Sequence, residues 1–212
     1  MIDSFNHAIV LFAKGGLVMY PLLVCSIIVV AVVIERFLYI CSVQTDITAL
    51  IPEIVHKLKA GNWYEAAQLC SDTNGIVAFV LAQGLINPVH DRQELEQILE
   101  GAAIRAVAKL RHRISYLDTI VTLAPLLGLL GTVIGMIQSF SVLTIKAGQT
   151  LAITGGVGEA LIATATGLCV AIIALVAHSY LNHCIEAIIT DIEETANATV
   201  TAAVQGWQNE AR

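Results

Sequence analysis

Three polar side chains lie in or next to long apolar runs of this 212-residue chain: Thr132, Glu159 and Thr164. Ionisable groups inside a membrane commonly mark ion or proton pathways, and hydroxyls can coordinate a cation or hold a chain of water molecules. One carboxylate and two hydroxyls would make an incomplete proton relay, because no Asp or Glu lies in the middle of an apolar run. If protons move here, a partner must supply the titrating group. A simpler alternative is that Glu159 caps the N-terminus of a helix, where negative charge is favourable.

The composition is that of a membrane protein. Hydrophobic residues make up 57% of the chain, charged residues 13%, and the mean hydropathy is +0.77. Typical soluble domains contain about 25% charged residues, so a soluble chain this poor in charge could hardly cover its surface. The net charge of −6 argues against nucleic acid as a partner, since nucleic acid attracts basic patches.

Neither metal binding nor cofactor binding is expected. The five cysteines are scattered without a CxxC motif, and the six histidines form neither HxxxH nor HExxH spacing. Such cysteines are typical of free thiols that pack as small hydrophobic groups. No nucleophile–base pair is recognisable, so the chain is expected not to be an enzyme.

Apolar runs of spanning length, about 20 residues, predict an all-α membrane protein with three transmembrane helices. Glu35 and Arg36 mark the water-facing end of the first span. From the N-terminus we expect a periplasmic-side amphipathic helix (1–16), transmembrane helix 1 (17–40), a cytoplasmic helical loop region (41–115), transmembrane helix 2 (116–145), a short periplasmic loop (146–158), transmembrane helix 3 (159–183) and a cytoplasmic tail (184–212).

The region 41–115 has helical periodicity that turn signals interrupt at 61–62, 74–75 and 87–89, which predicts four helices. We expect the last of them to begin near Asp91 and to continue unbroken into the second span. The second and third transmembrane helices are thus expected to extend into the cytoplasm.

The positive charges predict the orientation in the membrane. Eight Lys and Arg residues lie at Arg36 and in 41–115, whereas only Lys14 and Lys146 lie on the other side. Because positive residues are enriched in cytoplasmic loops, we expect a periplasmic N-terminus, a cytoplasmic loop region and a cytoplasmic C-terminus.

Small and polar residues form one stripe along each of the last two spans. On a helical wheel the stripe of the second span occupies a sector of roughly 100°, with bulky apolar residues opposite. Small residues let helices approach closely, so tight helix packing is one explanation, and lining a pore or contacting a partner helix is the other. The candidate residues are Ala124, Gly128, Gly131, Gly135 and Ser139 in the second span, and Ala163, Thr166 and Gly167 in the third.

A basic cluster precedes the second span and contains Arg105, Lys109, Arg111 and Arg113. It can enforce the topology or bind anionic lipid head groups at the inner leaflet. Asp118 is expected to form a surface ion pair with Arg111 or Arg113.

Three segments resemble the ExbB/TolQ/MotA proton-channel family. The first contains Gly15-Gly16 and Pro21 and closes with Glu35-Arg36. The second, residues 123–140, reads LAPLLGLLGTVIGMIQSF, and the third, residues 159–168, reads EALIATATGL. Together with the topology and the order of the loops, the resemblance covers nearly the whole chain, and ExbB is the most similar branch.

The resemblance implies a subunit of a stator ring, commonly of five copies, around single-span partners of the ExbD or TolR type. Each partner would carry the membrane Asp that takes up and releases protons. Thr132 and Thr164 would face this Asp, Glu159 would lie in the outer part of the pathway, and the two stripes would line the pore. Motion of the partner would then reach a TonB- or TolA-type protein that spans the periplasm.

The leading hypothesis is therefore a stator subunit that couples the proton-motive force to TonB-dependent outer-membrane import. A TolQ-like subunit of the Tol-Pal envelope system is the alternative within the family. A passive membrane scaffold, whose stripes serve only to pack helices, is the alternative from another class.

Overall fold

The computed structural model describes residues 15–44, 47–86, 88–145 and 150–210. These residues form helices and no strand, as expected for an all-α protein. The predicted amphipathic helix 1–16 falls almost entirely outside the described residues. In chain order the helices are α2 (Met19–Val43), α3 (Ile47–Lys59), α4 (Trp63–Asp72), α5 (Ile76–Leu85), α6 (Arg92–Arg111), α7 (Ile114–Ile145) and α8 (Thr150–Glu210).

Three of these helices are long and apolar enough to cross a membrane, which confirms the predicted number of spans among the described residues. Each of these helices contains an apolar window of 18 residues, and they run over Met19–Val43, Ile114–Ser141 and Gly155–Asn209. Each exceeds the roughly 20 residues that a bilayer requires. At 61 residues, α8 is about three times this length and contains both the third span and the predicted tail.

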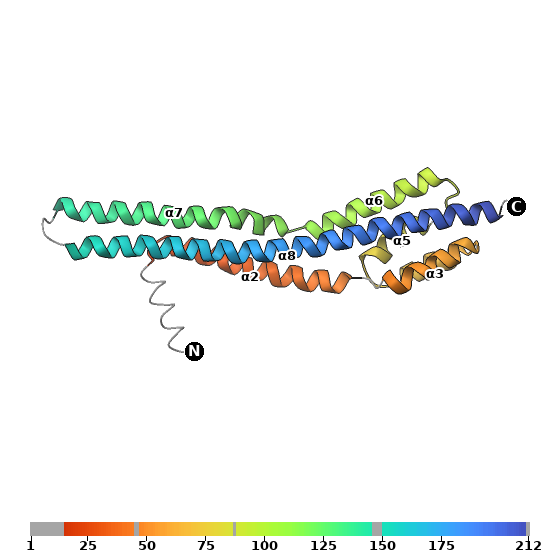
Figure 1. Cartoon of the computed structure of the whole chain (residues 1–212), viewed down its shortest axis with the longest axis horizontal. Coiled ribbons are helices and arrows are strands. Elements are labelled where there is room, and N and C mark those ends of the chain that lie inside the picture. The colour runs from red at the N-terminus through yellow and green to blue at the C-terminus, as the bar shows by residue number, and fades with distance from the viewer. Residues whose placement is uncertain (1–14, 45–46, 87, 146–149, 211–212) are drawn as a thin grey trace, which may run out of the picture. The chain divides into compact units, whose positions relative to one another are not determined.

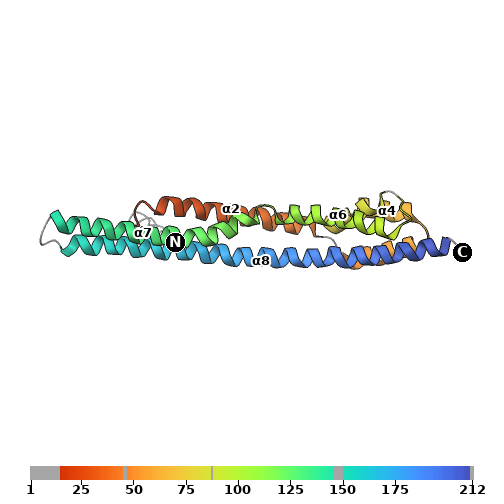
Figure 2. The ribbon, with the colours of Figure 1, turned by 90° about the horizontal axis from the view of Figure 1, so that it is seen from above.

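The chain folds into two compact units. The first contains residues 1–35 and 113–180, and the second contains residues 36–112 and 181–212. In the first unit α7 runs beside the first part of α8, with the start of α2 next to them (Figures 1 and 2). Its core joins all three helices through Val18, Met19, Leu22, Cys25, Val29, Ile120, Ala124, Val170, Ala171 and Ala174.

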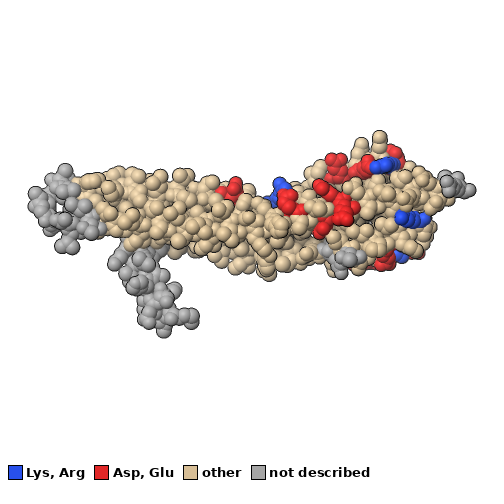
Figure 3. Space-filling model, viewed as in Figure 1, with Lys and Arg blue, Asp and Glu red and all other residues tan. Residues whose placement is uncertain are grey.

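The outward side chains of the first unit are large and apolar. Leu126, Ile137 and Leu161 are each more than 60% exposed. In Figure 3 the surface over α7 and the start of α8 carries few charged groups, whereas acidic and basic side chains gather around α6. A lipid environment accounts for this exposure, because monomeric soluble proteins rarely present such extended apolar surfaces.

The second unit contains the four helices predicted between the first two spans, α3 to α6. Asp91 caps α6 by accepting a hydrogen bond from the Gln93 amide, close to the predicted start of that helix. Trp63 joins α4 to α5 by donating its indole N–H to the Leu85 carbonyl at 2.8 Å, and its ring stacks on Trp207 of α8.

The fourth of these helices does not continue into the second span, contrary to the sequence-based prediction. α6 ends at Arg111, His112 leaves the helical conformation, and Arg113 adopts a left-handed backbone with φ 67°. This conformation costs a non-glycine residue about 1–2 kcal/mol. In this conformation Arg113 forms a 2.8 Å ion pair with Glu35, a residue far away in the sequence.

The loop between the last two spans is also shorter than the predicted 146–158, because residues 150–158 already belong to α8. Residues 146–149 lie outside the described part of the chain. The glycines at 155, 156 and 158 predicted a loop because glycine is about 1 kcal/mol less favourable than alanine in a helix. A side chain at Gly156 would collide with the Ser139 hydroxyl, so the close contact with α7 requires glycine and overrides its low propensity.

The burial of Cys70 in α4 gives a test of the second unit. Burial raises the pKa of the Cys70 thiol from 9.0 to about 12, and thiolates are the reactive species. We expect a maleimide at pH 8 to modify exposed Cys41 in the folded protein but to reach Cys70 only after denaturation. Mass spectrometry of the digested protein measures both sites. Equal labelling of Cys70 before and after denaturation would contradict its burial.

Candidate functional site

The small residues of the two stripes bring α7 and α8 into close contact within one chain. A methyl group added to Gly167 would lie 2.6 Å from the carbonyl oxygen of Ala124 and 3.0 Å from the Cα of Gly128. One added to Gly131 would lie 2.5 Å from the Cβ of Ala163. We call this set the α7–α8 contact; its residues are Ala124, Gly128, Gly131, Gly135, Ser139, Gly156, Ala160, Ala163, Thr164 and Gly167.

Burial agrees with this packing. Ala124, Ala163 and Ser139 are at most 3% exposed, and the predicted stripe glycines 128, 131, 135 and 167 are buried as well. Ser139 donates its hydroxyl hydrogen to the Gly135 carbonyl at 2.8 Å, so this buried group is satisfied within α7. Helix packing, one of the two explanations given for the stripes, thus describes these residues; a role in lining a pore stays a prediction.

Thr164 is the predicted pathway residue that lies in this contact. Its Oγ1 is 3.1 Å from the carbonyl oxygen of Gly128 on α7 and 3.3 Å from that of Ala160 on its own helix. The side chain is half-buried. A hydroxyl has one hydrogen and two lone pairs, so Thr164 can donate to one carbonyl and still accept a hydrogen bond.

Thr132 and Thr166 are also half-buried, but each bonds within its own helix. Thr132 donates to the Leu129 carbonyl at 2.6 Å, and Thr166 donates to the Ile162 carbonyl at 2.8 Å. Thr132 is one helical turn beyond Gly128. The structure therefore places Thr132 and Thr164 at neighbouring levels of adjacent helices, without a hydrogen bond between them.

Glu159 does not cap α8, which corrects the simpler of its two interpretations. The helix begins at Thr150, so Glu159 lies in its third turn. Its carboxylate occupies the space that a side chain at Gly16 would need, and Gly16 has a left-handed backbone with φ 70°. The left-handed backbone favours glycine, and the missing side chain of Gly16 leaves space for the half-buried carboxylate of Glu159.

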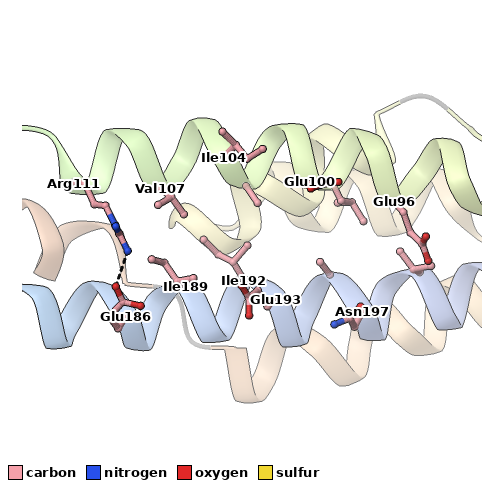
Figure 4. A pocket seen from close by; sticks show the side chains of 14 residues that line it. Glu96, Glu100, Ile104, Val107, Arg111, Glu186, Ile189, Ile192, Glu193 and Asn197 are labelled. Carbon is pink, nitrogen blue, oxygen red and sulfur yellow. Dashed lines mark hydrogen bonds and ion pairs between the residues drawn. The ribbon is translucent and has the colours of Figure 1, made fainter.

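The basic cluster divides into paired and unpaired residues. Arg111 donates to Glu186 at 2.6 Å, as Figure 4 shows, and Arg113 donates to Glu35 at 2.8 Å. The predicted ion pair with Asp118 is therefore wrong, because these carboxylates hold both arginines. No carboxylate partner is recorded in the described residues for Arg105 or Lys109, and both side chains are exposed.

The sequence analysis missed the burial of Arg36. We expected this residue at the water-facing end of the first span, yet it is 5% exposed. Its guanidinium donates to the Lys109 carbonyl at 3.3 Å and lies 5.0 Å above the Tyr39 ring. A charged residue next to an aromatic one on the same helix was the available signal, because arginine stacks readily on aromatic rings.

Comparisons with known proteins agree with these features. Residues 72–194 match the MotA/TolQ/ExbB proton channel family, and this range includes the α7–α8 contact, Thr132, Glu159 and Thr164. The chain belongs to this family. Its members are inner-membrane proton-channel and transport subunits.

Several curated members of the MotA/TolQ/ExbB family are similar to this chain. A putative biopolymer transport protein, ExbB-like 3 of Synechocystis, is 32% identical over 164 residues, 76% of this chain and 78% of the relative. The biopolymer transport protein exbB1 of Vibrio cholerae is 29% identical over 190 residues, which cover 86% of this chain and 82% of the relative. The Tol-Pal system protein TolQ of Haemophilus influenzae is 39% identical over 88 residues, which cover 41% of this chain and 39% of the relative.

Two glycines of α8 test the α7–α8 contact directly. We expect Gly167→Ala to destabilise the protein by about 1–3 kcal/mol, because the added methyl meets backbone atoms that cannot rotate away. The matched control is Gly158→Ala, where nothing lies within 4 Å of the added methyl, and helix propensity should raise stability by up to about 1 kcal/mol. Thermal unfolding of both variants in detergent measures the difference, and equal melting temperatures would contradict the contact.

Proposed function

We propose that this chain is the inner-membrane stator subunit of an ExbB–ExbD-type proton-driven motor. The motor couples the proton-motive force to TonB-dependent import across the outer membrane. The chain works with copies of itself in a ring, a pentamer in this proposal, around single-span ExbD- or TolR-type partners. Its N-terminus is periplasmic, and its helical loop region and C-terminus are cytoplasmic.

The proton pathway in this proposal is shared between chains. The partner's membrane Asp takes up and releases the proton, Thr132 and Thr164 face it, and Glu159 serves the outer part of the pathway. Ala124, Gly128, Gly131, Gly135, Ser139, Ala163, Thr166 and Gly167 form the wall that supports these groups. The chain contributes fixed polar positions and the partner contributes the titrating group.

The placement of Thr164 is the observation that carries the proposal. Its hydroxyl is tied to the backbone of the neighbouring helix at Gly128, yet the side chain is only half-buried. A polar group that is held in position and remains accessible suits repeated contact with a moving proton carrier. A scaffold would be packed equally well by valine, which has the same shape and no hydroxyl.

Thr164→Val tests the pathway against the scaffold. The chain and its one-span partner are reconstituted in liposomes, and a membrane potential drives proton uptake that a trapped pH-sensitive dye reports. We expect about a five- to tenfold lower proton flux, because one hydrogen bond of roughly 1–1.5 kcal/mol is lost from the pathway. The complex should still assemble with the same subunit ratio.

Two control variants separate chemistry from packing. Thr164→Ser keeps the hydroxyl and should retain most of the flux, whereas Thr119→Val removes an exposed hydroxyl that bonds within α7 to the Ser115 carbonyl and should have a small effect. Wild-type flux in Thr164→Val would overturn the pathway and favour the scaffold. A complex that fails to assemble would instead place Thr164 among the structural residues.

A TolQ-like role is the second candidate, since a TolQ protein is among the similar sequences. The two roles differ in the periplasmic client rather than in the membrane chemistry. In a strain without its own stator genes, we expect this chain and its partner to restore TonB-dependent uptake. Restored envelope integrity without restored uptake would favour the TolQ-like role.

A further inference from the structure

A hollow of about 510 Å³ in the second unit combines positive charge with apolar walls. The end of α2, the start of α5 and one face of α6 line it. Arg105 and Lys109 contribute the charge, Asn74 contributes an amide, and Val43, Ile76 and Phe79 contribute apolar surface. Proton transfer as proposed above uses none of these residues.

The two cations of this hollow differ from the rest of the basic cluster. Arg111 and Arg113 are neutralised by glutamates at 2.6 and 2.8 Å. Arg105 and Lys109 have no recorded carboxylate partner among the described residues, and no carboxylate lines the hollow. Their spacing of four residues places them on the same face of α6, where like charges repel each other. A bound anion would relieve this repulsion and would fit the recurrent pairing of such cations with phosphate.

The backbone adds a third positive feature. α5 begins in the hollow at Ile76, and its N-cap, Gly75, offers no side chain to the first amide groups of the helix. Unsatisfied amides and the helix dipole favour anions at this position. This feature supports the two cations and would not define a site without them.

The apolar part of the hollow indicates that the anion belongs to an amphiphile. Phe79, which lines the hollow, is 53% exposed. Phe37 and Leu38, which do not line the hollow, add exposed apolar surface on the last turns of α2, at 45% and 63%. The uncharged run of α2 ends at Ile34, and Tyr39 follows about 7 Å later at 1.5 Å per residue. The head-group layer is roughly 5–8 Å thick on each side of the bilayer, so Tyr39, which lines the hollow, lies at head-group depth.

We propose that this hollow binds the phosphate head group of an anionic phospholipid of the inner leaflet, with Arg105 and Lys109 on the phosphate and Phe79 against the glycerol and acyl region. The inference rests on the proposed function only for its topology, which turns this region toward the anionic cytoplasmic leaflet. It divides the basic cluster into a lipid-binding pair, Arg105 and Lys109, and an ion-paired pair, Arg111 and Arg113.

Nanodiscs that contain the complex and equal amounts of phosphatidylglycerol and phosphatidylcholine test the proposal. The complex is extracted, and the lipids that remain bound are counted by native mass spectrometry. We expect wild type to retain phosphatidylglycerol, and Arg105→Gln/Lys109→Gln to lower this retention at least about tenfold, as expected for two lost lipid-facing cations. The matched control, Arg92→Gln/Arg111→Gln, removes two charges of the same helix that already have glutamate partners and should retain the lipid.

Inorganic phosphate separates a lipid from a free anion. Millimolar phosphate should not displace the bound lipid, because it lacks the apolar part, and Phe79→Ala should weaken lipid retention while both cations remain. Displacement by phosphate, or unchanged retention in Phe79→Ala, would reassign the hollow to a soluble anion. Equal retention by wild type and Arg105→Gln/Lys109→Gln would overturn the site.

Proton flux in pure phosphatidylcholine liposomes is measured separately, so loss of the lipid site and loss of the proposed function give different results.

Discussion

The close approach of α7 and α8 constrains the rest of the membrane unit. At Gly131, Gly135 and Gly167 an added Cβ atom would lie less than 3.0 Å from an atom of the other helix, so the distance between the helices leaves no room for it. In a bilayer, where hydrophobic burial does not drive helices together, such van der Waals packing is a principal source of association. The bulky side chains on the opposite faces of α7 and α8, such as Leu126, Ile137 and Leu161, are exposed on the outer surface. From the remaining side α2 packs against Ile120 and Val170 and completes the core.

This contact also fixes the polar groups. Thr164 reaches the α7 backbone only because Gly128 exposes its carbonyl at 3.1 Å, and Glu159 keeps its position because Gly16 has no side chain. In the proposed motor, the fixed wall and the moving acid belong to different chains. The wall can therefore remain rigid through a cycle in which the partner's Asp changes its charge, and no titrating group need be buried in this chain.

The sequence predicted the parts of the fold that follow from local pattern. The three spans follow from the hydropathy of the chain, and the two faces of small residues follow from the helical period of the sequence. The remaining features depend on contacts between distant residues. The break at Arg113 has no Gly or Pro to signal it, and Glu35, the residue that pairs with Arg113 there, lies 78 positions away in the sequence. Likewise, the burial of Arg36 depends on the Lys109 carbonyl, 73 residues away. The residues of the candidate site could be predicted from the sequence. Which of them are packed between helices and which remain accessible could be seen only in the structure.

Moving one methyl group from Ala163 on α8 to Gly131 on α7 tests this account most directly. Gly131→Ala should destabilise the protein, because its new Cβ lies 2.5 Å from that of Ala163, and Ala163→Gly alone should destabilise it through lost helix propensity. Unfolding of both single variants and the double variant in mixed detergent micelles gives their coupling energy. The account predicts that the double variant regains stability, with a coupling of at least about 1 kcal/mol. Additive effects within about 0.5 kcal/mol would contradict direct packing of these residues within one chain.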